Sequence, residues 1–156
     1  MSQSVGTVVA IHITAAAGQP LQPVPQAQAI TGRGLEGDRY HKKAGTFSSK
    51  PGAGRDVTLI EVEALEALQR DYNLEISAAE TRRNIVTRGI ALNHLIGHEF
   101  KIGKARLRGV RLCEPCGYLA KMTSDAASKA LIHRGGLRCD VVTGGTIQVG
   151  DSVASD

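Results

Sequence analysis

Two cysteines separated by two residues are the most specific chemical feature of this sequence. The segment LCEPCGYL places Cys113 and Cys116 where a strand pattern gives way to a helix pattern. In a structural zinc site, two thiolates from one tight turn occupy two corners of a tetrahedron. Cys139 and His133 are the available partners for such a site. In a thioredoxin-like dithiol the motif also needs a downstream proline facing it, whereas Pro115 is the last proline of this chain.

A third chemistry needs one reactive thiolate. Cys116 follows Pro115 in what would be the first turn of a helix, where backbone N–H groups and the positive end of the helix dipole stabilise a thiolate. The alternative is that both thiols are small buried hydrophobic groups, as free cysteines often are. Spacing alone leaves zinc binding, dithiol exchange, a single nucleophile and simple packing open.

A basic segment immediately precedes the cysteines. Residues 101–111, KIGKARLRGVR, carry five positive side chains and no acid. In a strand, alternate residues share one face, which here would hold Lys104, Arg106 and Arg108. Either that face is solvated, or some of its side chains line a pocket for a phosphorylated or otherwise anionic ligand. The other arginines that would contribute to such a pocket are Arg82, Arg83, Arg134 and Arg138.

The glycine-rich segment 32–41, GRGLEGDRYH, contains the spacing GxGxxG. It lacks the following helix and the later acidic residue that a dinucleotide site requires, so the spacing is a weak signal. Asp38 and His41 would suit an acid–base or ligand pair, but a carboxylate in a turn more often caps its own backbone. We expect structural roles for the remaining histidines, His12, His94 and His98.

Length, charge and composition limit the function classes. The 156 residues suit one domain, and the formal charge of +4 is mild. No Trp and few other aromatic residues argue against stacking on nucleic-acid bases. No apolar run approaches the roughly 20 residues that span a bilayer, and the N-terminal residues lack a signal-peptide pattern. Three cysteines, an odd number, suit a reducing cytoplasm better than a disulfide framework.

The elements that would position these residues are mostly short strands. The pattern predicts strands at 5–14, 56–60, 84–87, 99–102 and 105–112, with a possible bulge at Gly109, and two or three more after residue 135. Residues 15–30 read as a loop with at most an edge strand, and residues 32–55 as largely irregular. We expect helices over 61–72, at 92–95 and, with a break, over 115–132. The fold class is therefore mixed α+β, predominantly β and barrel-like.

Five blocks of the sequence together resemble one known family. They are GLEGDRY at 34–40, DVTLIEVEALEAL at 56–68, RRNIVTRGIALNHLIGHEFKIGKARLRG at 82–109, CEPCGYL at 113–119 and GDSV at 150–153. In this order they resemble the MOSC domain, the C-terminal domain of molybdenum-cofactor sulfurase. The resemblance spans nearly the whole chain, as one MOSC-like domain over 1–156. It implies a β-barrel of the pyruvate-kinase-barrel type with peripheral helices.

The resemblance also implies a chemistry. The family is associated with sulfur transfer and molybdenum-cofactor handling, through a cysteine that carries sulfur as a persulfide or ligates molybdenum. That cysteine maps onto Cys116, with Cys113 as the secondary candidate. Arg82 and Arg83 match the family pattern and would grip the pterin phosphate. The full set of cofactor-binding candidates is Arg82, Arg83, Asn84, Arg106 and Arg108.

The expected function is that of a cytoplasmic sulfur carrier or sulfurtransferase acting on molybdenum cofactor or a molybdenum enzyme. Family members with sulfurase activity carry a pyridoxal-phosphate desulfurase domain, which does not fit within 156 residues. Pyridoxal phosphate is therefore expected on a partner cysteine desulfurase, or another donor supplies the sulfur. The alternatives are a non-catalytic molybdenum-cofactor-binding protein with Cys116 as metal ligand, and a small zinc-stapled binding module. No nucleic-acid or membrane partner is expected.

Overall fold

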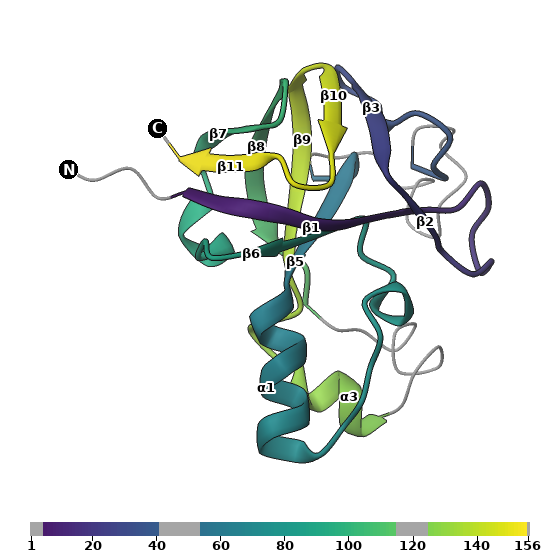
Figure 1. The fold of residues 1–156 in the computed structure, drawn as a ribbon, viewed down its shortest axis with the longest axis vertical. Coiled ribbons are helices and arrows are strands. Elements are labelled where there is room, and N and C mark those ends of the chain that lie inside the picture. The colour runs from purple at the N-terminus through teal and green to yellow at the C-terminus, as the bar shows by residue number, and fades with distance from the viewer. Residues whose placement is uncertain (1–4, 41–53, 115–124, 156) are drawn as a thin grey trace.

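The fold is built around a closed β-barrel (Figure 1). The computed structural model describes residues 5–40, 54–114 and 125–155. Within these residues, seven strands follow one another in the order β11, β7, β8, β9, β5, β6 and β1, and pairing of β1 with β11 closes the ring. The strands are β1 Val5–Ile13, β5 Val57–Glu61, β6 Ile85–Arg88, β7 Glu99–Ile102, β8 Ala105–Leu112, β9 Leu137–Thr143 and β11 Ser152–Ser155.

Most of these strands match the prediction, because alternation of apolar and polar residues is strong in them. The β5–β6 pair is parallel, and the other barrel pairs are antiparallel. The register of β8 against β9 shifts between Gly109 and Arg111, which confirms the bulge expected at Gly109. The predicted barrel-like, predominantly β class is thereby confirmed.

The segment 15–30 corrects one prediction. Its first strand, β2 Gln22–Val24, lies at the edge of the barrel sheet beside β1, as expected. Its second strand, β3 Gln26–Ile30, was not expected, and it pairs with β10 Gly145–Gln148 and with β4 Gly34–Leu35 in a separate sheet. The alanines of β3 are buried and its glutamines are exposed, so pairing with a distant strand overrides the low strand propensity of its residues.

The barrel encloses an aliphatic core, as the low aromatic content predicts. Residues such as Leu59, Ile85, Leu107 and Val153 are fully buried within it, together with Phe100. In a closed barrel of this size, inward side chains fill the interior completely. The barrel therefore acts as a rigid support, and sites for ligands are expected at its ends and on the attached segments.

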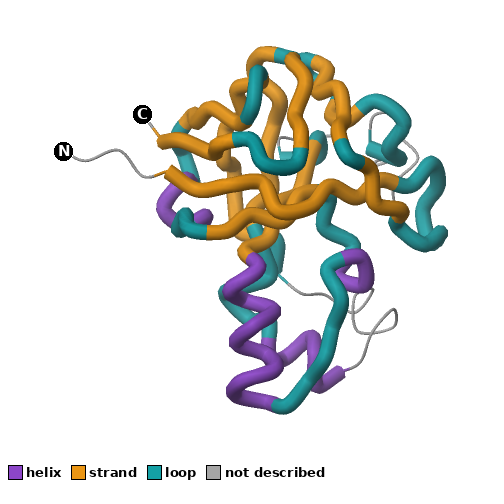
Figure 2. Tube along the Cα trace, in the orientation of Figure 1, coloured by secondary structure: helices purple, strands orange, loops and turns teal. Residues whose placement is uncertain are grey.

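Two helices lie at one end of the barrel (Figures 1 and 2). Helix α1, Val62–Tyr72, begins directly after β5, and its Leu68 packs with Ile60, Val86 and Leu131 in a second apolar cluster. The other helical elements are η1 Ala79–Thr81, η2 Leu92–Leu95 and α3 Asp125–Ala130. Helix α3 confirms part of the helix predicted over 115–132, and residues 115–124 lie outside the described part. No helix among the described residues is long and apolar enough to cross a membrane.

Candidate functional site

The two-cysteine motif begins where β8 leaves the barrel. The backbone N–H of Cys113 donates a hydrogen bond of 2.7 Å to the carbonyl oxygen of Gly136, at the start of β9. The side chain of Cys113 is buried, with 1% of its surface exposed. A buried thiol of this kind packs and is shielded from electrophiles. Cys116 itself lies outside the described residues.

Arg83 fixes the chain around this point. Its Nε donates to the carbonyl oxygen of Gly135 at 2.7 Å, and its Nη2 donates to that of Cys113 at 2.8 Å. Its Nη1 donates to the carbonyl oxygen of Thr81 at 3.2 Å. With a buried guanidinium directed at three carbonyls, Arg83 joins β6 to the ends of β8 and β9. The structure thus brings this predicted residue to the cysteine motif and places it in contact with backbone groups.

Arg82 contacts a different part of the chain, although it is adjacent to Arg83 in the sequence. It adopts a left-handed backbone conformation with φ 64°, and its Nη1 donates to the carbonyl oxygen of Gln19 at 2.8 Å. It also lines a cavity of about 210 Å³ formed with residues 18–21 and 79–80. The RRN motif therefore anchors the chain on two sides, with Arg82 toward the 18–21 turn and Arg83 toward Cys113.

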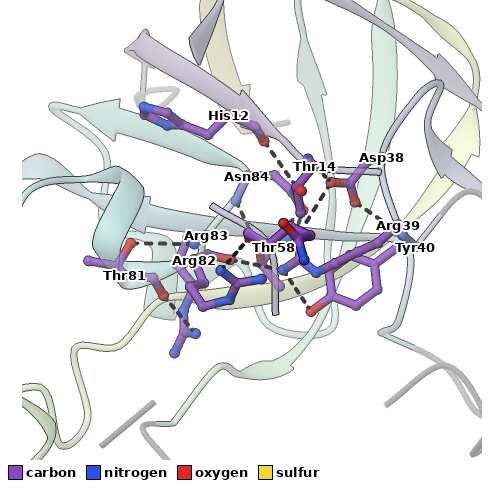
Figure 3. Close-up of polar contacts among 11 residues, drawn as sticks. His12, Thr14, Asp38, Arg39, Tyr40, Thr58, Thr81, Arg82, Arg83 and Asn84 are labelled. Atoms are coloured by element: carbon purple, nitrogen blue, oxygen red, sulfur yellow. Dashed lines mark hydrogen bonds and ion pairs between the residues drawn. The ribbon is translucent and has the colours of Figure 1, made fainter. Parts of the chain in front are cut away.

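Asn84 connects three strands inside the barrel (Figure 3). Its Oδ1 accepts from the backbone N–H of Thr58 at 3.1 Å and from the Thr58 hydroxyl at 3.2 Å. Its Nδ2 donates to the carbonyl oxygen of His12 at 3.2 Å, and the side chain is fully buried. Asn84 therefore ties β1, β5 and the start of β6 together.

The GLEGDRY motif contacts the RRN motif directly. Asp38 accepts from the backbone N–H groups of Thr14 at 3.1 Å and Tyr40 at 3.2 Å, and from the Arg39 guanidinium at 3.2 Å. Arg39 in turn donates from Nη2 to the carbonyl oxygen of Arg82 at 3.1 Å. These contacts confirm that Asp38 caps its own turn. Its predicted alternative partner, His41, lies outside the described residues.

His12 lies buried on β1. Desolvation lowers its pKa from the ordinary value of 6.5, and its Nδ1 is buried with no hydrogen-bond partner among the described residues. Its backbone N–H and carbonyl both bond to Asn84. A neutral imidazole in this position agrees with the structural role expected for it.

The basic face of β8 lies away from the cysteine motif. Lys104 and Arg108 are exposed and Arg106 is half-buried, alternating with buried residues, so the predicted shared face is confirmed. Arg106 Nη1 lies 3.7 Å from Glu99 Oε1 on the neighbouring strand. Arg108 precedes Cys113 by five residues, about 16 Å of extended chain. The structure does not bring Arg106 and Arg108 to Arg83 and Cys113.

Three other arginines do gather at the motif, and we call them the arginine cluster: Arg55, Arg111 and Arg138. Arg111 on β8 pairs across the sheet with Arg138 on β9. Arg111 is exposed, but partial desolvation of its guanidinium lowers its pKa. The charges of Arg138 and Arg55 lower it further, whereas Cys113 and Asp140 act in the opposite direction. Like charges held together in this way create a positive potential beside the cysteine motif.

Sequence reasoning identified this cluster incompletely. Arg138 was among the anion-binding candidates and Arg111 belonged to the basic segment, but Arg55 was missed. Arg55 follows a glycine-rich stretch and meets the other two through tertiary structure, where an added Cβ on Gly54 would lie 3.0 Å from Arg111 Nη1. One signal was available, since Arg111 lies two residues before Cys113 and side chains at that spacing point to one face of a strand.

The described zinc candidates do not assemble. The exposed side chain of His133 lies with its Nδ1 3.0 Å from Glu114 Oε2. Cys139 is buried inside the barrel, and desolvation raises the pKa of its thiol well above the usual range. Within residues 5–40, 54–114 and 125–155, no three metal-binding side chains come together. A zinc site would therefore depend on Cys116, which lies outside these ranges.

Comparison with known proteins agrees with this architecture. The family model of the MOSC domain matches residues 44–154. The fold is similar to the YuaD protein from Bacillus subtilis, with TM-score 0.82 and 16% identity over 99% of this chain and 98% of that one. It is also similar to YiiM from Geobacillus stearothermophilus, with TM-score 0.70 and 16% identity over 97% and 75%. No curated protein sequence matches the chain.

Proposed function

Because the chain belongs to the MOSC domain family, which is related to the C-terminal domain of molybdenum-cofactor sulfurase, we propose that it is a sulfur carrier or sulfurtransferase. Cys116 would be its nucleophile, and molybdenum cofactor or a molybdenum enzyme its acceptor. The observation that carries this proposal is the arginine cluster at the end of β8, beside the start of the cysteine motif. A reducing cytoplasm would keep the thiols free.

The proposed chemistry is a thiol–persulfide exchange. The Cys116 thiolate attacks the terminal sulfur of a persulfide on a donor, such as a pyridoxal-phosphate-dependent cysteine desulfurase. A new S–S bond forms on Cys116 while the S–S bond of the donor breaks, and the donor leaves as a thiolate that takes up a proton. No net oxidation occurs, because one persulfide replaces another.

Positive charge assists this exchange in two ways. Cationic side chains near a thiol favour its thiolate, which is the nucleophilic form. Arginines also bind phosphate through paired, charge-assisted hydrogen bonds. The arginine cluster therefore fits the phosphate of a pterin cofactor that arrives as the acceptor substrate. No three metal-binding side chains gather among the described residues, and we assign any direct contact with molybdenum to Cys116.

In the proposed site, the RRN motif holds the backbone around the start of the cysteine motif. Arg83 holds the carbonyl of Cys113 and the neighbouring carbonyl of Gly135. Asn84 holds the strand from which Arg83 projects. Such buried contacts fix the end of β8 at Cys113 relative to the arginine cluster.

The test is intact mass spectrometry before and after incubation with a cysteine desulfurase and cysteine. We expect a gain of roughly 32 Da that a reductant removes. Cys116→Ser should abolish the gain, whereas Cys139→Ser, the matched control in the barrel interior, should retain it. No gain in the wild-type chain would refute the proposal, and loss in Cys113→Ser alone would move the nucleophile to Cys113.

Metal analysis of the same samples separates the alternatives. A carrier should be isolated without bound metal. Stoichiometric molybdenum that Cys116→Ser loses would instead favour a cofactor-binding protein. One zinc per chain, with unfolding when a chelator removes it, would favour a zinc-stapled module.

A further inference from the structure

A second polar cavity lies between α1 and the turn before β9. Its volume is about 320 Å³, within the range of sites that bind small molecules. None of the arginine cluster lines it. The lining residues are Glu61, Glu63, Ala64, Ala67, Arg70, Asn93, His133 and Arg134.

The sequence of α1 makes this cavity. Its residues 63, 64, 67 and 70 recur at the three- and four-residue spacing that places side chains on one helix face. Ala64 and Ala67 are small and buried, so the middle of this face leaves open space. The opposite wall comes from Asn93 and His133, which are joined by a hydrogen bond of 3.1 Å from Asn93 Nδ2 to the His133 carbonyl oxygen.

Two carboxylates occupy the end of the cavity at the start of α1. Glu61 Oε2 accepts from the backbone N–H of Leu92 at 3.3 Å, and Glu63 Oε2 accepts from that of Gly89 at 2.8 Å. Each carboxylate is therefore held in a fixed orientation by one oxygen. Glu63 Oε1 is buried and has no hydrogen-bond partner among the described residues. This end therefore presents two oriented carboxyl groups, and burial, with the nearby Glu63, raises the pKa of Glu61.

Arg134 supplies the opposite charge. Among the described residues, no carboxylate lies within ion-pair distance of its guanidinium, and it acts on Glu61 and Asp71 at longer range. The other arginine of the lining, Arg70, is committed to Asp71 through two hydrogen bonds of 2.6 and 2.7 Å. Arg134 is therefore the cation of this cavity that a ligand could engage.

We propose that this cavity binds a small zwitterion of the amino-acid class, with its ammonium group at Glu61 and Glu63 and its carboxylate at Arg134. A simple anion would meet two fixed carboxylates, and a simple cation would leave Arg134 without a counter-charge. A divalent metal is disfavoured because no three metal-binding side chains gather among the described residues. The proposal is independent of sulfur transfer.

The experiment is a titration of the full chain followed by amide chemical shifts and calorimetry. L-serine and glycylglycine are the zwitterionic probes. Ethanolamine and 3-hydroxypropionate are matched to L-serine, because each lacks one of its two charged groups. We expect saturable shifts at the amides of residues 93, 133 and 134 from a zwitterion, and binding at least about tenfold weaker for the single-charge probes, since each loses a charge-assisted contact.

Two variants and two controls complete the test. Arg134→Gln and Glu61→Gln should each weaken binding of the zwitterion by about tenfold or more. Arg108→Gln and Glu36→Gln should leave it unchanged, because these exposed side chains do not line the cavity. All variants should keep the wild-type circular dichroism spectrum.

Three results would overturn the inference. They are no saturable shift from either zwitterion at tens of millimolar, ethanolamine binding as tightly as L-serine, and wild-type affinity in Arg134→Gln. The same titration on Cys116→Ser should match the wild type. Failure of the sulfur-transfer proposal would therefore leave this result untouched.

Discussion

Two groups of arginines lie at the same end of the barrel and differ in what their guanidinium groups face. Arg39 and Arg83, the carbonyl-bound pair, are buried and directed at backbone carbonyls, with Asp38 as an added partner of Arg39. The arginine cluster at β8 and β9 gathers like charges. Proximity to the cysteine motif is common to Arg83 and the cluster, so proximity alone does not indicate which arginines bind a ligand.

This difference separates arginines with a structural role from arginines that could bind a ligand. A buried guanidinium bonded to carbonyls has its partners in the folded chain. Removing it leaves those carbonyl oxygens without a hydrogen bond. Like charges held close together repel one another, and an anion bound beside them reduces that repulsion. The carbonyl-bound pair should therefore govern stability, and the arginine cluster should govern affinity for anions.

The largest effect is expected for Arg83→Met. Three carbonyls each lose a hydrogen bond worth about 1 kcal/mol, so the free energy of unfolding should fall by about 3 kcal/mol. The matched change in the cluster, Arg111→Met, should alter it by less than about 0.5 kcal/mol, because the Arg111 side chain is exposed. Urea unfolding measures both values. Equal losses would remove the distinction between the two groups.

The next effect concerns anion binding. Pyrophosphate should raise the Tm of the wild-type chain, because a ligand that binds the folded state stabilises it. Arg111→Gln and Arg138→Gln should each weaken pyrophosphate binding by about tenfold, or roughly 1.4 kcal/mol. Arg108→Gln, on the solvated face of β8, should leave it unchanged. If Arg108→Gln caused the loss instead, the assignment to the basic strand face would be correct and the assignment to the cluster wrong.

A smaller effect is expected from His12, whose carbonyl bonds to Asn84 beside the carbonyl-bound pair. Burial lowers the pKa of this histidine in the folded state, so the unfolded state takes up the proton more readily. Its contribution to stability is present above the unfolded pKa of 6.5 and is lost as pH falls through the lower folded value. Between about pH 7.5 and pH 5, urea unfolding should show a steeper loss for wild type than for His12→Leu. Identical slopes would contradict this role.

The smallest effect is the response to salt. Sodium chloride screens repulsion within the arginine cluster, so it should stabilise the wild-type chain by a few tenths of a kcal/mol. Arg111→Gln should show a reduced response, and Arg83→Met an unchanged one, when unfolding is compared at low and high ionic strength. If Arg83→Met lost the salt response, the repulsion would involve Arg83 and not the arginine cluster, which would contradict this prediction.

The sequence predicted the barrel well because its strands carry clear periodicity. The boundaries of β7 and β8 and of α1 follow directly from alternation and from the change to helical spacing at Val62. Strand β3 was not predicted, because glutamine and alanine have little strand propensity and its partner β10 lies more than 100 residues away. Such pairing is a property of the closed fold, which local patterns do not contain.

The site was predictable in part. Resemblance of motifs made Arg83 a candidate for binding the pterin phosphate, and the structure shows it bonded to the carbonyl oxygen of Cys113. Its bonding to carbonyls could not be foreseen, because Gly135 lies 52 residues away in sequence. Arg106 and Arg108 were grouped with it by charge, but strand geometry carries them toward the other end of β8. The charges in the sequence identified candidate anion-binding arginines. Only the tertiary contacts distinguish those that lie near the cysteine motif from those that do not.

The seam between β1 and β11 has a consequence for how the chain folds. Val5 pairs with Ala154, so this contact joins segments separated by almost the whole sequence. Pairings of such long range slow folding, because the entropy of closing a large loop must be overcome first. On the ribosome, closure must wait until the β11 segment has been synthesised. Until then β1 and β7 present open edges, and chaperone protection would matter most during that interval.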